Sequence, residues 1–184
     1  MSTPPASRAK SAVFAVGSYV PKTAAQLTHL LTQPGLQAIE LEVSALLDPT
    51  GRSAVFTAAR TALHEALTAG RDCVLSTSRR LITGSDDAAS LGIGRLVSDA
   101  LIELVRSLAV RPRFLIAKGG ITSSDVANLG LGVRRAMVRG QILPGVPVWR
   151  TGPESKFPGL DFVVFPGNVG GETALAEVVA KFPR

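Results

Sequence analysis

The segment Lys118-Gly119-Gly120-Ile121-Thr122-Ser123 combines the residue types that hold a phosphate group. It directly follows an apolar run at 113–117 that has the length and composition of a buried strand. Glycines let the backbone approach an anion closely, and consecutive N–H groups form a concave anion site. The hydroxyls of Thr122 and Ser123 can donate further hydrogen bonds, and Lys118 can add a positive charge. The segment therefore predicts a phosphate-binding loop.

Two other loops have the same form, in which a glycine-containing turn separates an apolar strand from a helix. One begins at Gly17-Ser18 and the other spans residues 166–171. Strands of an open parallel sheet end at one edge, where ligands of such folds bind. A helix that begins there presents free N–H groups and the positive end of its dipole. The candidate ligand residues of these loops are Ser18, Gly167, Asn168, Gly170 and Gly171.

A plainer interpretation of these loops stays open. A glycine turn after a strand is often only a tight connection, and Thr122, Ser123, Ser124 or Asp125 can simply cap a helix. Gly92 and Gly94 fall inside a predicted helix, where small residues favour close packing or a local break over dinucleotide binding.

Other chemistries lack the residues that they need. The P-loop signature is absent, since the lysine here precedes the glycines, and there is no Gly-x-Ser-x-Gly elbow of a hydrolase. His29 and His64 are the only histidines, and their spacing predicts no metal site. Asp86-Asp87 either caps a helix or holds Mg²⁺ beside phosphates. Glu154 lies in a loop that either covers a ligand or is a plain surface loop.

The pattern of elements predicts an α/β fold, with a mostly parallel sheet flanked by helices in a Rossmann-like three-layer arrangement. Strands are predicted at 12–16, 37–43, 73–77, 113–117 and 162–165, and helices at 22–31, 53–69, 88–108 and 172–180. Gly70 is predicted to end the second of these helices. Alternating polarity places the second strand near an edge of the sheet. Between 133 and 165 the pattern changes to short strands at 133–138 and 146–150, separated by Gly140 and a Leu143-Pro144-Gly145 turn. We expect residues 1–11 to be a flexible lead-in and residues 12–184 to form a single domain.

The formal net charge of +6 favours anionic partners such as nucleotides, sugar acids or nucleic acid. The basic residues are scattered and form no stripe with interleaved aromatic residues, so nucleic-acid binding is not favoured. No apolar run is long enough to cross a membrane, and the first residues do not resemble a signal peptide. The single Cys73 lies in an apolar run, which predicts a buried thiol and a reducing compartment such as the cytoplasm.

Residues 118–127, Lys-Gly-Gly-Ile-Thr-Ser-Ser-Asp-Val-Ala, resemble the signature of the C-terminal, nucleotide-binding domain of the four-carbon acid sugar kinases. The similarity continues through 140–149, 152–155 and 165–170. Gly17-Ser18 with Thr23 and Gln26 resembles the start of the same domain. The resemblance therefore covers nearly the whole chain after residue 12.

This resemblance implies ATP with Mg²⁺ as the phosphate donor, and a sugar acid such as threonate, erythronate or an oxo-tetronate as the acceptor. The ATP contacts of the family correspond here to Ser18, Gly119, Gly120, Thr122, Ser123 and Gly167. The loop pattern adds Asn168, Gly170 and Gly171, and no catalytic residue is assigned. Most of the sugar-acid site belongs to an N-terminal domain that this sequence lacks. Since phosphoryl transfer requires both substrates in line, we expect the chain to bind ATP but to transfer phosphate poorly by itself.

Two other functions remain open. One is a non-catalytic α/β binding or assembly module of a larger multidomain metabolic protein. The other is a stand-alone enzyme of a different type, for which the sequence offers no convincing base or nucleophile. With any of these functions, apolar surface exposed where the N-terminal domain would dock is expected to favour a homo-oligomer.

Overall fold

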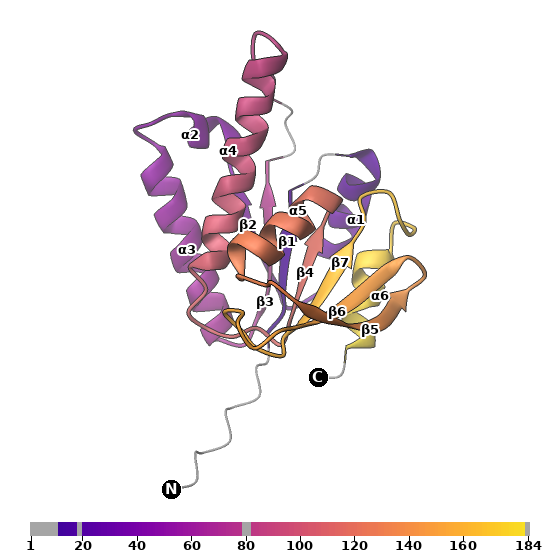
Figure 1. Cartoon of the computed structure of the whole chain (residues 1–184). Helices are drawn as coiled ribbons and strands as arrows, with labels where there is room; N and C mark the ends of the chain where they lie inside the picture. Colours follow the sequence, from indigo (N-terminus) through magenta and orange to yellow (C-terminus); the bar gives the residue numbers. More distant parts are fainter. Residues whose placement is uncertain (1–10, 18–19, 79–81, 183–184) are drawn as a thin grey trace, which may run out of the picture.

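The computed structural model describes residues 11–17, 20–78 and 82–182. They form a seven-stranded sheet in the order β2-β3-β1-β4-β7-β6-β5 (Figure 1). The strands are β1 (Val13–Val16), β2 (Leu36–Leu41), β3 (Asp72–Thr77), β4 (Phe114–Lys118), β5 (Ala136–Leu143), β6 (Val146–Thr151) and β7 (Asp161–Phe165). The first four strands and β7 are parallel, whereas β6 and β5 continue the sheet as antiparallel strands.

Helices cover both faces of this sheet, so the predicted three-layer α/β fold is confirmed. They are α1 (Pro21–Leu31), α2 (Val43–Leu47), α3 (Arg52–Thr68), α4 (Asp87–Arg106), α5 (Gly120–Asp125), the π-helical turn η1 (Val126–Gly130) and α6 (Ala174–Lys181). Figure 1 shows α3 and α4 on one face and α1 with α6 on the other. In the described part of the chain, no helix has the length and hydropathy needed to cross a bilayer.

Strand β1 shows why the central runs are apolar throughout. Val13 and Ala15 belong to the core beneath α3 and α4, whereas Phe14 and Val16 belong to the core beneath α1 and α6. Both faces of the strand are thus buried, as expected for a parallel sheet between two helical layers. By contrast β2 lies at the sheet edge, as its alternating sequence predicted.

Several helix and loop predictions hold. Asp86 caps α4, since its carboxylate accepts a hydrogen bond from the Ala89 N–H at 2.7 Å. Gly70 follows α3 with a φ of 74°. Cys73 is fully buried, and its pKa is raised to about 12 by burial.

Other local predictions were wrong. Gly140 does not separate two strands, because it lies within β5 at a register shift, where its φ of 126° accommodates a bulge. The packing role of Gly92 and Gly94 is not observed, since a Cβ on either would meet no atom within 4 Å. Ser11 is buried and its hydroxyl donates to the Leu67 carbonyl at 3.2 Å, so it belongs to the domain and not to the lead-in. The rest of the predicted lead-in, residues 1–10, lies outside the described residues.

Candidate functional site

The sheet topology brings three glycine-containing loops to one edge. Strands β1, β4 and β7 are adjacent and parallel, so the loops that follow them lie side by side. A Cβ added to Gly17 would lie 2.9 Å from Thr122 Oγ1, so the first loop touches α5. The N–H of Gly119 donates to the Phe165 carbonyl at 2.8 Å, which joins the second loop to the end of β7.

The chain leaves this edge in opposite directions. After β1 it enters α1, whose Leu27 and Leu30 belong to one core, and after β4 it enters α5 and η1, whose Val126 belongs to the other. Neighbouring strands whose connections diverge in this way leave a crevice at their carboxyl ends, the usual ligand site of open α/β sheets.

The loop after β4 is shaped by its own backbone. Gly119 has φ 111° and ψ 143°, a conformation essentially confined to glycine. It serves as the N-cap of α5, and the first intrahelical bond runs from the Ser123 N–H to the Gly119 carbonyl at 2.8 Å. The N–H groups of Gly120, Ile121 and Thr122 precede that bond and therefore have no partner within the helix. Such groups at a sheet edge can bind an anion.

The residues after Thr122 have structural roles. The Ser123 hydroxyl donates to the Ala117 carbonyl at 2.8 Å and the residue is 1% exposed, so its side chain joins α5 to β4. This position differs from the predicted ligand contact of Ser123. Ser124 and Asp125 lie within α5, so the prediction that they cap a helix was wrong. Asp125 instead accepts a hydrogen bond from the Ser98 hydroxyl at 3.2 Å, which links α5 to α4.

The loop after β7 is held from below by side chains. Most of its carbonyl groups accept hydrogen bonds from β4 and α1. The bonds are Lys118 Nζ to Pro166 (2.7 Å) and Gly167 (3.2 Å), Thr23 Oγ1 to Gly167 (3.3 Å), Lys22 Nζ to Asn168 (3.1 Å), and Gln26 Nε2 to Val169 (2.9 Å) and Gly171 (2.8 Å). In a trans peptide the C=O and the following N–H point in opposite directions. The N–H groups that follow these carbonyls are therefore directed away from β4 and α1.

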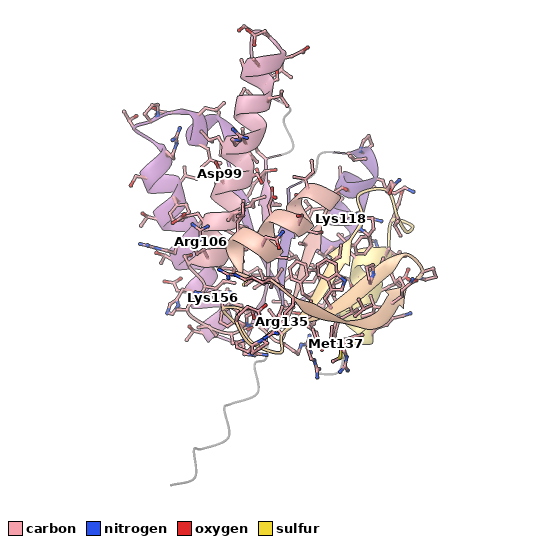
Figure 2. The ribbon with its side chains drawn as sticks, viewed as in Figure 1. Asp99, Arg106, Lys118, Arg135, Met137 and Lys156 are labelled. Atoms are coloured by element: carbon pink, nitrogen blue, oxygen red, sulfur yellow. The ribbon has the colours of Figure 1, made fainter. Side chains whose placement is uncertain are left out.

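Lys118 lies beneath this loop, at the carboxyl edge of the sheet (Figure 2). Its side chain is fully buried, and Nζ is 4.2 Å from the centroid of the Phe165 ring. Burial, together with the nearby charge of Lys22, lowers the pKa of Lys118 to about 8. The sequence predicted that Lys118 adds a positive charge at this edge, and the structure shows that its ammonium group donates to loop carbonyls.

The glycines of the site fall into two groups. Gly170 is required by packing, since a Cβ would lie 2.5 Å from Ala174 Cβ, and a Cβ on Gly17 would displace the end of the Leu101 side chain, whose Cδ1 would be 2.9 Å away. Gly120, Gly167 and Gly171 have no such requirement, because a Cβ at any of them would meet no atom within 4 Å. The second group leaves bare backbone facing open space, which is the condition for close approach of a phosphate.

The remaining candidates lie elsewhere. Ser18 is outside the described residues. Glu154 lies in the loop before β7, at the opposite end of that strand from the site. Its own N–H and those of Arg134 and Arg135 lower the pKa of Glu154 to about 2. The hydrogen bonds from Arg134 and Arg135 hold the start of β5 in place, and Glu154 covers no ligand at this edge. Within the described residues, no three His, Cys, Asp or Glu side chains gather where they could hold a metal ion.

The resemblance to the kinases pointed to Thr23 and Gln26, but their role came only from the structure. Both are fully buried although polar, and they stand on the face of α1 that also carries Leu27 and Leu30. Polar residues at core-facing positions of a helix are the sequence signal that could have identified them.

Comparison with known proteins agrees with this geometry. Residues 13–175 match the family described as the nucleotide-binding C-terminal domain. The chain belongs to this family. The resemblance to the C-terminal domain of the four-carbon acid sugar kinases is thereby confirmed, and the matched residues include the three loops at the sheet edge.

Relatives of this nucleotide-binding domain are longer proteins. It is 31% identical to a D-threonate kinase of Cupriavidus necator over 160 residues, which make up 87% of this chain but 37% of the relative. A Bordetella bronchiseptica protein of unknown function, solved as a domain-swapped dimer with bound citrate, has a TM-score of 0.74 at 20% identity over 91% of this chain and 40% of its own. A Haemophilus influenzae protein has a TM-score of 0.70 at 19% identity, over 95% and 40% of the respective chains. The chain thus spans about two fifths of these relatives.

Proposed function

We propose that this domain binds ATP at the carboxyl ends of β1, β4 and β7, and that it serves as the nucleotide-binding half of a kinase for a four-carbon sugar acid. The observation that carries the proposal is the convergence of the three loops in a chain of the nucleotide-binding family. In this account the phosphates approach Gly120 in the second loop and Gly167 in the third, where no side chain obstructs the backbone.

The residues at this edge suit a polyphosphate. The first turn of α5 offers N–H groups from Gly120 to Thr122, and the loop after β7 directs its N–H groups away from the core. Lys118 and Lys22 place positive charge beneath the same loop. Mg²⁺ keeps most of its water ligands and is commonly held by substrate phosphates, so it would arrive with ATP and neutralise charge on the phosphates.

The acceptor is proposed from the D-threonate kinase relative. We infer an acid of the threonate, erythronate or oxo-tetronate class, held mainly by the part of such proteins that has no counterpart here. A chain that orients only the phosphate donor loses the advantage of placing two reactants in line. We therefore expect ATP binding without efficient phosphoryl transfer from the 184-residue chain alone.

Calorimetric titration of the chain with ATP and Mg²⁺ tests this function. We expect saturable binding at nucleotide concentrations up to millimolar, together with an increased Tm, because a ligand that binds only the folded state stabilises it. Adenosine should bind more weakly, since it lacks the phosphates that the loops hold. If millimolar ATP produces no binding heat and no increase in Tm, the proposal is refuted.

Self-association is a second proposed property. Strand β5 forms one edge of the sheet, and its Met137 and Val138 are each 67% exposed. Figure 2 labels Met137 on this strand. An uncovered edge strand with apolar side chains can pair with another chain. The Bordetella bronchiseptica neighbour is itself a domain-swapped dimer. Light scattering after size-exclusion chromatography should show a dimer that Val138→Lys weakens, whereas a monomer at all concentrations would exclude it.

A further inference from the structure

Lys118 is a buried cation with an unusual set of partners. Its ammonium group contacts the carbonyls of Pro166 and Gly167 and the face of the Phe165 ring. The ion pairs found among the described residues do not include Lys118. A buried charge normally requires a counter-ion, and carbonyl dipoles with an aromatic ring compensate it only in part. The environment of Lys118 therefore favours the arrival of an anion nearby.

Lys22 adds a second positive charge to the same loop, again without a counter-ion among the ion pairs of the described residues. Its Nζ donates to the carbonyl of Asn168, the residue directly after the carbonyls that Lys118 holds. It is also the charged group whose field disfavours the protonated form of Lys118. The same loop thus has positive charge on its inner side at consecutive peptide groups. Each of these peptides directs its N–H outward, so its dipole presents a positive end to the proposed phosphates.

We propose that Lys118 is a positioning residue of the nucleotide site, which acts on the phosphates through the peptide groups of Pro166 and Gly167 and does not bind them directly. This inference rests on the proposed function. The protonated amine draws the two carbonyls inward and thereby fixes the outward N–H groups. An anion bound on the far side of those peptides stabilises the ammonium form in return, so ATP binding and protonation of Lys118 favour each other.

This coupling has a measurable sign. Because the pKa of Lys118 lies near 8 without nucleotide, part of the population is neutral at about pH 8.5. ATP binding should raise that pKa and draw a proton from the buffer. Phosphate groups do not titrate in this range, since their second pKa is about 6. If ATP raises the pKa by one unit, affinity falls about sevenfold between pH 7.5 and pH 10.

The test is the calorimetric titration of the intact chain with Mg·ATP at about pH 8.5, in buffers of different ionisation enthalpy. We expect uptake of a fraction of a proton by the wild-type chain and none by Lys118→Met. Lys22→Met, a matched removal of a cation from the same loop, should retain proton uptake but shift the pH dependence upward, because Lys22 lowers the pKa of Lys118.

Failure of the proposed role of Lys118 and failure of the proposed function would give different results in this experiment. If the wild-type chain binds ATP without proton uptake and with unchanged affinity from pH 7.5 to pH 10, the role of Lys118 is refuted and the proposed function stands. If it binds no ATP at any pH, the proposed function fails and this inference fails with it. Should Lys118→Met not fold, the wild-type pH series and the Lys22→Met variant still decide the question.

Discussion

The loops after β4 and β7 lie side by side at the sheet edge, but different interactions hold their backbones in place. The β4 loop is set by its own backbone, with Gly119 at φ 111° leading directly into α5. The β7 loop is instead held through its carbonyl groups by Lys118 and by α1 side chains more than a hundred residues away in sequence. The conformation of the β4 loop therefore depends on local backbone geometry, whereas that of the β7 loop depends on tertiary contacts. Different substitutions should therefore disrupt the two loops.

Gly170→Ala should have the largest effect on stability, and it tests the β7 loop. The new Cβ would lie 2.5 Å from Ala174 Cβ, at a φ of 79° that alanine rarely adopts. Overpacking and strain together should lower the free energy of unfolding by about 3 kcal/mol. Gly171→Ala is the matched control, because its Cβ meets open space. Urea unfolding curves that coincide for the two variants would contradict the assigned loop geometry.

The charge of Lys118 should produce an effect of similar size in the stability of the free chain. Its folded-state pKa of about 8 lies below the ordinary lysine value of 10.5, so folding opposes protonation. The resulting destabilisation is fully present below pH 8 and disappears as pH rises toward 10.5. Relative to Lys118→Met, the wild-type chain should gain about 3 kcal/mol over this range. A constant difference in unfolding free energy between pH 7.5 and 10.5 would argue against a lowered pKa.

For the β4 loop the corresponding change is Gly119→Ala. Its backbone conformation is accessible essentially to glycine alone, so we expect a loss of about 2 kcal/mol in unfolding free energy. Gly120→Ala lies next to it in the first turn of α5 and should be neutral or slightly stabilising, since alanine favours helix and has room there. Equal stabilities would mean that the loop backbone is not strained as described.

The smallest expected effect on stability is that of a substitution that weakens ATP binding and leaves the fold intact. Gly120→Val places a side chain where the phosphates approach, and it should weaken ATP affinity about tenfold while leaving Tm within a few degrees. Gly92→Val is a matched control, because Gly92 also lies in a helix and faces open space, but it belongs to α4 and to none of the three loops. Unchanged affinity in Gly120→Val would count against the placement of the nucleotide.

Much of the fold could be predicted because strands and helix ends have signals in the local sequence. Continuous apolar runs identified the buried parallel strands, and Asp86 and Gly70 marked helix ends through short-range chemistry. The five-residue α2 is too short for a periodic signal. Gly140 was interpreted as a breaker because a bulge and a turn use glycine alike.

The site was harder to predict in detail. Sequence and resemblance selected three loops that the sheet brings to one edge, but they could not show which way each side chain points. Ser123 faces inward because α5 begins at Gly120, and a helix that began one residue later would turn it elsewhere. The partners of Lys118 and Gln26 could not be predicted for another reason, since they lie in a loop that only the tertiary fold brings near.

We have proposed that the phosphates of ATP lie on the backbone of the β4 and β7 loops. The most direct test is an NMR titration of the ¹⁵N-labelled chain with Mg·ATP, following every backbone amide. We predict the largest shift changes at Gly120–Thr122 and at Gly167–Gly170, with little change in α3 or β5. Saturable shifts confined to another surface, or no shifts at millimolar nucleotide, would contradict the account.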